Sequence, residues 1–355
     1  MAKRETDMRN KADILYENLV QTIEAIPPGE QLPSVRQLMY RHSVCQQVVV
    51  QVLDRLEKYG RIVRRPGKGV FRAGGVRSGP FRLALATPDW PALQYSEFEA
   101  RLIQEGKKRE FEIERVYFSL SGHNIFHELP IREYHAVVLL GNRPLSIDDL
   151  NLIANSPTSM LLIGRTFYGT GLNYIGSDPM KNGMLAARYL LDCGHRNIGV
   201  VVSESREFEI ARQRLDGFRF WAENHSCRLT VIDPEIRSGG DPAQKSYEAM
   251  KYLLAQGKPE FTALYALSDP SCLGIIKALQ EYGIRVPEEV GVIGSDGICQ
   301  SAFYTPSLTT VSLDFTDYAE QVLDAAEKLY QDRNCLIQRE MVPFILERSS
   351  ILRRF

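Results

Sequence analysis

The chain of 355 residues lacks the long apolar runs that membrane spans and secretion signals require. No stretch reaches 18 uninterrupted apolar residues, and the first residues, MAKRETDMRNKAD, are mostly polar. We therefore expect a cytoplasmic protein with no membrane span and no signal peptide. With 44% hydrophobic and 25% charged residues, the composition also excludes disordered, fibrous and disulfide-rich chains.

Motifs for metals, disulfides and catalysis are scarce as well. The six cysteines are scattered singly with no C-x-x-C pair, which is typical of free thiols in a reducing cytosol. Only His123 and His127 stand four residues apart, in a loop-like stretch. No G-x-S-x-G, P-loop or strand-linked G-x-G-x-x-G motif is present. We predict no metal site, no cofactor and no catalytic residue, and hence a binding protein rather than an enzyme.

The formal net charge of -1 hides an uneven distribution. Residues 1–76 carry 13 Lys and Arg against 8 Asp and Glu, so this part is basic and the remainder is acidic. A small basic module joined to a larger acidic one favours a polyanion as the partner of the first part.

The basic part has the pattern of a winged helix-turn-helix. Apolar residues recur at helical spacing over residues 7–26, and Pro33 is suited to the first turn of a second, short helix. A third helix is expected from about Cys45, followed by strands at 62–65 and 70–72 around a Pro-Gly-Lys-Gly turn. Three helices and a hairpin predict an α+β DNA-binding fold over residues 1–73.

Residues 31–72 closely resemble the GntR-type winged helix. Leu32, Pro33, Ser34, Arg36, Leu38, Val44, Leu53, Leu56, Gly60, Gly67 and Gly69 stand at the matching positions. The resemblance implies binding of an operator in double-stranded DNA, with Ser34 among the contacting residues. The chain departs from the family at Gln46, where Arg is usual, and at Cys45, Val48 and Val50, so we expect fewer guanine contacts and a shift towards A·T pairs.

The recognition helix and the wing supply the candidate DNA contacts. Gln pairs bidentately with adenine, so Gln46 and Gln47 are candidate base readers, and Arg36 is suited to guanine or phosphate. In the wing, Arg64, Arg65 and Lys68 surround a glycine-rich tip that can approach the DNA backbone closely. Alternatively, the apolar residues of this helix pack inward or against the duplex.

The larger part alternates strand-like and helical segments. A Gly/Ser/Pro-rich linker at 74–80 precedes an α/β domain at 81–355. Candidate strands are 81–86, 113–118, 136–140, 160–163, 174–176, 198–202, 229–232, 263–266 and 290–293. Repeated β-α units predict parallel sheets covered by helices, with ligands at the carboxyl ends of the strands.

Residues 174–219 are similar to the LacI/GalR effector-binding domain, through an Asp before a helix, then G-H-R-x-I-G and R-x-x-G-F. The similarity continues through V-P-E-E-V-G-V-I-G at 286–294, T-P-S-L-T-T-V at 305–311 and E-R-S-S at 347–350. It implies a periplasmic-binding-protein-like sensor of two lobes. We expect lobe 1 at 81–193 and 314–337, and lobe 2 at 194–313 and 338–355.

The same resemblance points to residues for an effector pocket. Arg214 and Asp296 match the family's arginine and carboxylate, Phe315 matches a pocket wall, and Ser268 and Asp269 end another strand. Trp90, Tyr95 and Phe98 follow the first strand and are candidates for an aromatic face in the other lobe. Each also has a structural alternative: Arg214 pairs with Glu209, Asp296 caps a turn, or Phe315 belongs to the core.

Together these features predict a homodimeric, effector-controlled transcription regulator, most simply a repressor. A GntR headpiece on a LacI-like sensor is the arrangement of arabinose-repressor-type proteins, so we expect a sugar effector without specifying which sugar. A purine or another metabolite, or a sensor that serves only dimerisation, remain alternatives. An extracytoplasmic solute-binding protein is disfavoured by the basic headpiece.

Overall fold

The computed structural model describes residues 2–27, 29–58, 61–72, 80–88, 93–118, 134–140, 145–237 and 239–354. The chain divides into two compact units, Met1–Pro80 and Phe81–Phe355. Most of the expected linker at 74–80 lies outside the described residues. Among the described helices, none is long and apolar enough to cross a membrane.

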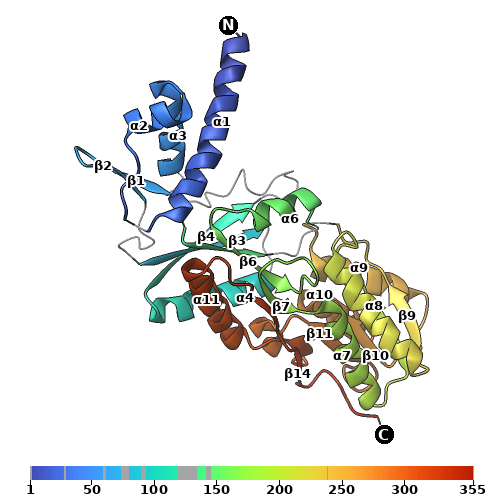
Figure 1. Cartoon of the computed structure of the whole chain (residues 1–355). Helices are drawn as coiled ribbons and strands as arrows, with labels where there is room; N and C mark the ends of the chain where they lie inside the picture. Colours follow the sequence, from blue (N-terminus) through green and yellow to red (C-terminus); the bar gives the residue numbers. More distant parts are fainter. Residues whose placement is uncertain are drawn as a thin grey trace. The chain divides into compact units, whose positions relative to one another are not determined.

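The first unit is a winged helix-turn-helix, coloured blue in Figure 1. Its elements are α1 (Ala2–Ala25), α2 (Val35–His42), α3 (Gln46–Lys58) and the antiparallel hairpin of β1 (Ile62–Arg65) and β2 (Gly69–Arg72). One core joins the three helices to the hairpin, because Leu15, Leu38, Leu53 and Ile62 are all buried within it. The predicted architecture of this unit is confirmed.

The second helix begins later than predicted. Ser34, not Pro33, is its N-cap: the Ser34 hydroxyl accepts from the backbone N–H of Gln37, and the Gln37 side chain accepts from the Ser34 N–H. This reciprocal arrangement satisfies two donors at the start of the helix, so Pro33 precedes the helix instead of occupying its first turn.

The second unit begins with a lobe built on a parallel sheet ordered β13-β7-β6-β5-β3-β4. Its strands are β3 (Phe81–Pro88), β4 (Phe111–Phe118), β5 (Ala136–Leu140), β6 (Ser159–Arg165), β7 (Tyr174–Ser177) and β13 (Gln338–Glu340). Helices α4 (Leu93–Lys108) and α11 (Phe315–Gln331) pack on one face, and α6 (Ile147–Ala154) packs on the other (Figure 1). Strand β5 is buried at every position, as expected for a strand covered on both faces.

The second lobe has the same three-layer plan around the order β14-β12-β11-β10-β8-β9. Its strands are β8 (Asn197–Val201), β9 (Arg228–Ile232), β10 (Ala263–Ala266), β11 (Gly291–Ser295), β12 (Thr309–Ser312) and β14 (Phe344–Leu346), the last of them antiparallel. Helices α7 (Pro179–Asp192) and α8 (Glu209–Asn224) cover one face, and α9 (Pro242–Ala255) and α10 (Asp269–Glu281) cover the other. A short 3-10 helix, η2 (Cys299–Phe303), follows β11.

All nine predicted strands are present within two residues of their expected ends. The chain crosses between lobes at places that differ from two of our expectations. Helix α7 packs in the core of the second lobe, so the first crossing lies at Asp178 and not near Gly194. The second crossing lies near Leu313, as expected, but β13 still pairs with β7, so the third follows Glu340 instead of Gln338.

Two aspartates begin the helices that follow these crossings. Asp178 accepts from the backbone N–H groups of Met180 and Lys181, which caps α7. Asp314 accepts from Thr316 and Asp317 in the same way, which caps α11. Each cap satisfies donors that a helix start would otherwise leave unpaired.

Candidate functional site

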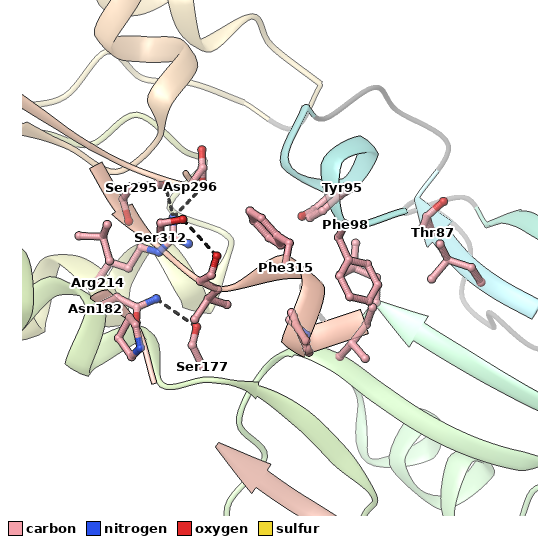
Figure 2. Close-up of a pocket in the computed structure, with 18 residues that line it drawn as sticks. Thr87, Tyr95, Phe98, Ser177, Asn182, Arg214, Ser295, Asp296, Ser312 and Phe315 are labelled. Atoms are coloured by element: carbon pink, nitrogen blue, oxygen red, sulfur yellow. Dashed lines mark hydrogen bonds and ion pairs between the residues drawn. The ribbon is translucent and has the colours of Figure 1, made fainter. Parts of the chain in front are cut away.

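A pocket lies between the two lobes, at the carboxyl ends of strands from both sheets (Figure 2). It has a volume of about 100 Å³. The lining combines a polar end from the second lobe with aromatic side chains from the first. In open α/β sheets, ligands bind in the crevice outside the carboxyl ends of the strands, and this pocket lies in such a position.

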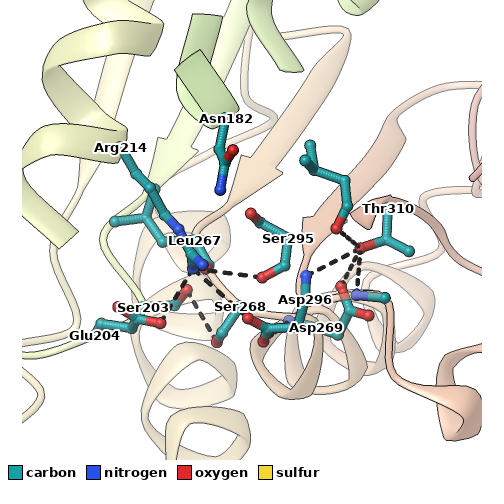
Figure 3. Close-up of polar contacts among 12 residues, drawn as sticks. Asn182, Ser203, Glu204, Arg214, Leu267, Ser268, Asp269, Ser295, Asp296 and Thr310 are labelled. Atoms are coloured by element: carbon teal, nitrogen blue, oxygen red, sulfur yellow. Dashed lines mark hydrogen bonds and ion pairs between the residues drawn. The ribbon is translucent and has the colours of Figure 1, made fainter. Parts of the chain in front are cut away.

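Arg214 on α8 organises the polar end. Its Nη1 donates to the carbonyl oxygen of Leu267 at 2.7 Å and lies 3.3 Å from Glu204 Oε1 and 3.6 Å from Asp296 Oδ1 (Figure 3). All three charged side chains are largely buried, and Asp296 is only 2% exposed. Arg214 and Asp296 therefore lie together in the pocket, whereas Glu209 pairs with another arginine.

Burial raises the pKa of both carboxyl groups near Arg214. Desolvation raises the pKa of Glu204, and that of Asp296 rises well above its ordinary value, while Arg214 acts in the opposite direction. Although burial opposes it, the two carboxylates raise the pKa of Arg214, which stays a cation. Because one guanidinium faces two carboxyl groups, the polar end carries no surplus positive charge for an anion.

Ser268 and Asp269, which we expected in the pocket, lie beneath its floor. Asp269 is fully buried; it accepts from Thr310 Oγ1 at 2.6 Å and from the Ile298 N–H at 3.1 Å. Its own N–H donates to Asp296 Oδ2 at 3.1 Å, and burial raises its pKa to about 6. The Ser268 hydroxyl contacts Ser203 and Ser271 instead of the cavity. Asp269 therefore positions Asp296, and neither Ser268 nor Asp269 is among the residues that line the pocket.

The aromatic end contains three of the four aromatic residues that we expected there. Tyr95 and Phe98 of α4 and Phe315, the first residue of α11, line the cavity (Figure 2). Phe315 also packs against the core of the first lobe, so the pocket and core roles coexist. Trp90 lies outside the described residues.

Sequence reasoning missed Ser177 and Asn182. Ser177 ends β7, and Asn182 lies in the first turns of α7, so the two flank the first crossing. Asn182 Nδ2 donates to Ser177 Oγ at 3.1 Å, and both side chains line the pocket (Figure 2). The signal for them in the sequence is a polar residue that ends a strand directly before a capped helix.

Ion pairs connect the two lobes beside the pocket. Arg165, at the end of β6, lies 2.8 Å from Glu209 at the start of α8, and its guanidinium stacks over the Phe167 ring. Lys181 of α7 lies 2.7 Å from Glu340 of β13. These contacts link the lobes in the arrangement that the structure holds.

None of the described residues that line this pocket is a histidine. Throughout the part of the chain that the structure describes, no group of three or more His, Cys, Asp or Glu side chains could hold a metal ion. His195 is fully buried between Thr262 Oγ1 and the Leu352 carbonyl oxygen, so its role is structural. Burial, assisted by Arg354, lowers its pKa to about 4.

The winged helix presents a second group of predicted residues. Arg36 of α2 and Gln46 and Gln47 at the start of α3 have exposed side chains, as readers of DNA require. Val48 is buried in the core, which supports the packing interpretation for that position. Ser34 is exposed, but its hydroxyl is engaged in capping α2.

The three cationic side chains of the wing differ in their contacts with the rest of the unit. Arg64 lies 2.7 Å from Asp54 and 3.4 Å from Glu57, both on α3, so it holds the hairpin to that helix. Arg65 lies over the Phe71 ring, and Lys68 is exposed at the turn. Gln31 Nε2 donates to the Lys68 carbonyl oxygen at 2.9 Å, which fixes the tip.

Comparison with known families defines the class of protein. Residues 11–71 match the bacterial regulatory proteins of the gntR family, and residues 187–351 match the periplasmic binding protein-like domain. The chain therefore joins a gntR-type helix-turn-helix domain to a periplasmic-binding-protein-like domain.

Several individual proteins resemble parts of the chain. It is 35% identical over 164 residues to the HTH-type transcriptional repressor PurR of Haemophilus influenzae, a match that covers 46% of this chain and 48% of the relative. PurR of Pasteurella multocida is also 35% identical, over 167 residues. The chain thus spans about half the length of the curated relatives it matches.

Solved structures share the two-lobed fold. The Escherichia coli repressor ascG aligns with a TM-score of 0.65 at 19% identity, covering 77% of this chain and 99% of that one. A LacI family regulator from Enterococcus faecium with bound ribose aligns with a TM-score of 0.65 at 18% identity, covering 77% and 100%. The α/β unit therefore has the fold of LacI-family regulators.

Proposed function

We propose that this protein is a transcriptional repressor whose affinity for an operator changes when a small effector binds between the two lobes. The observation that carries the proposal is the presence, in one chain, of a winged helix with exposed Arg36, Gln46 and Gln47 and a pocket at strand ends around Arg214. The PurR-named relatives are repressors, which supports a regulator over an enzyme.

The effector is a small neutral molecule with hydrogen-bonding groups and one apolar face. Glu204 and Asp296 already neutralise Arg214, so a phosphate or carboxylate would meet two acidic groups at the polar end. The rings of Tyr95 and Phe315 supply apolar faces. A volume of about 100 Å³ is well below the ~300–1,000 Å³ of drug-sized pockets, which favours one ring over a disaccharide or nucleotide.

A monosaccharide satisfies these requirements best, because its hydroxyls both donate and accept while its C–H face packs on an aromatic ring. The bound ribose in the E. faecium regulator supports this choice. A purine base is the competing effector, since it is also neutral, carries hydrogen-bonding groups and has a flat face that can stack on an aromatic ring.

The repressor is proposed to act as a homodimer, with two winged helices on adjacent half-sites of the operator. Dimeric Lac repressor is among the solved structures that share the fold, at a TM-score of 0.68 and 20% identity. Effector binding would favour one arrangement of the lobes and thereby alter the spacing of the DNA-binding units.

The test measures coupling in both directions. An operator is selected from a random DNA library, and effectors are sought by thermal shift among pentoses, hexoses, purine bases, sugar phosphates and uronic acids. Operator affinity with and without the effector, and effector affinity with and without the operator, must change by the same factor. A change in only one of the two affinities would contradict the proposal. Arg214→Met is the control for the pocket, and Gln46→Ala is the control for the DNA face.

A further inference from the structure

Asn182 has a buried oxygen without a partner at the polar end of the pocket. The residue is 5% exposed, and its Nδ2 is used by Ser177 Oγ. Its Oδ1 is buried and accepts no hydrogen bond from any described residue. Buried side-chain oxygens are nearly always paired in folded proteins, so an unpaired oxygen on a residue that lines a pocket indicates a ligand.

Arg214 shows the complementary feature. Its Nη1 donates to the carbonyl oxygen of Leu267, whereas its Nε is buried and donates to no described residue. Two residues that line the pocket therefore each carry one buried polar atom, an acceptor in Asn182 and a donor in Arg214, that has no partner among the described residues. Figure 2 shows both side chains at the second-lobe end of the pocket.

Close packing of two helices fixes these groups relative to each other. Gly183 follows Asn182 directly, and a Cβ there would overlap the carbonyl oxygen of Arg214. Gly217 makes the reciprocal approach, with a Cβ that would overlap the Met180 carbonyl oxygen. Backbone contact at both glycines holds α7 against α8, so Asn182 and Arg214 form one preorganised pair.

We propose that Asn182 is a specificity-determining residue whose Oδ1 accepts a hydrogen bond from an O–H or N–H of the effector, while Arg214 Nε donates to an acceptor on the same molecule. This inference rests on the proposed effector pocket and defines the ligand further. The pair selects a ligand with a donor and an acceptor close together, such as a hydroxylated ring. It rejects a group that has only acceptors, because such a group would face the lone pairs of Asn182.

The experiment compares the full chain with Asn182→Asp, Asn182→Leu and a matched control. Asp retains acceptors and removes the amide donor, whereas Leu has nearly the same shape and removes both. The control is Ser246→Ala, because Ser246 Oγ on α9 is also buried without a partner among the described residues but lies outside the pocket lining. The probes are L-arabinose, D-xylose, D-ribose, D-glucose, adenine and hypoxanthine, measured by thermal shift and calorimetry.

For a probe that binds the wild type, we expect Asn182→Asp and Ser246→Ala to keep the dissociation constant within about threefold, and Asn182→Leu to raise it by about tenfold or more. Equal loss in the Asp and Leu variants would overturn the proposal, because it would mean that the amide N–H reads the ligand. Unchanged affinity in the Leu variant would also overturn it.

The free protein provides a separate test. Asn182→Leu removes the hydrogen bond to Ser177 but also removes the buried unpaired oxygen, and the two effects oppose each other. The Tm of the ligand-free variant should therefore stay within about 2 °C of the wild type or exceed it. A fall of more than about 4 °C would assign Asn182 a structural role and overturn the inference. If no probe shifts the wild type, the proposed effector class fails, and this Tm comparison still decides the role of Asn182.

Discussion

Arg165 in the first lobe and Glu209 in the second form an ion pair with 2.8 Å between Nη1 and Oε2. The arginine is 11% exposed and stacks on Phe167, so its position is well defined. Because the partners belong to different lobes, the pair contributes only when the lobes adopt the arrangement seen here. It would therefore bias the equilibrium between lobe arrangements on which the proposed effector control depends.

A double-mutant cycle measures this bias. Arg165→Met and Glu209→Gln should each weaken effector binding, and their combination should weaken it by less than the sum, with a coupling energy of about 1 kcal/mol. Calorimetric titration of the four proteins gives the value. Additive effects would show that the contact does not stabilise the effector-bound arrangement. Lys258→Met with Glu289→Gln is a control pair, since both residues belong to the second lobe.

Removal of Arg214 should destabilise the protein in a pH-dependent way. Arg214→Met leaves Glu204 and Asp296 buried without their cation, which should lower the free energy of unfolding by about 3 kcal/mol at pH 7.5. Both carboxyl groups have raised pKa values in the folded state, so the folded protein binds more protons and the loss becomes smaller as the pH falls.

Urea unfolding at pH 7.5 and pH 5.5 measures this difference. The variant Arg214→Met with Asp296→Asn should recover part of the stability at pH 7.5, because one uncompensated charge is removed. A loss that is equal at the two pH values would show that packing, and not charge, dominates at this residue.

His195 should make the protein more sensitive to acid. Its pKa falls from 6.5 to about 4 in the folded state, so the unfolded chain binds the proton more readily between these values. Stability from this residue is complete above pH 6.5 and decreases as the pH falls towards 4. Wild type should lose about 2 kcal/mol through His195 between pH 7.5 and pH 5, and His195→Gln should lack this loss. Parallel unfolding curves for the two proteins would contradict the assignment.

The sequence was sufficient to predict most of the fold. Winged-helix elements and buried β-strands leave strong local patterns, and 62–65, 136–140 and 263–266 were predicted at their observed bounds. The short strands β12, β13 and β14 were not predicted, because three or four residues carry too little periodicity. Which lobe α7 joins depends on tertiary packing that the local sequence does not encode.

The pocket was predicted in part for a similar reason. Arg214, Asp296, Tyr95 and Phe315 do line it, but Asp269 follows a strand in the same way and points beneath the floor. A strand end specifies the edge of the sheet and does not specify which side chain enters the cavity. Asn182 was not predicted, because the sequence does not show whether a buried side-chain oxygen has a hydrogen-bond partner.

Substitutions at Ser34 should change the stability of the winged helix without changing its affinity for DNA. Ser34→Ala should destabilise the winged helix by about 1 kcal/mol through loss of the α2 cap, and Ser34→Asp should restore most of it. Operator affinity of the folded protein should change little in both variants. Circular dichroism melting and fluorescence anisotropy together distinguish the two roles. A large loss of affinity with unchanged melting would instead assign Ser34 to the DNA interface.

Gln46 and Lys68 should respond differently to the operator sequence. Gln46→Ala should cost about 1–3 kcal/mol at one A·T pair and relax selectivity there, whereas Lys68→Ala should weaken all sequences alike and reduce the salt slope by about 1. Selection from a random library with each variant tests both expectations. A half-site anchored on guanine in the wild type would contradict the preference that we infer from Gln46.

The three crossings between lobes follow Ser177, Ser312 and Glu340, and each is only a few residues long. Asp178 and Asp314 bond to the helices that follow, so a swivel at either crossing leaves the helix start intact. The two lobes are thus joined by three short connections that, among the described residues, contain no helix or strand. Under the proposed function, turning one lobe against the other would break the Arg165–Glu209 and Lys181–Glu340 ion pairs together with the contacts of a bound effector.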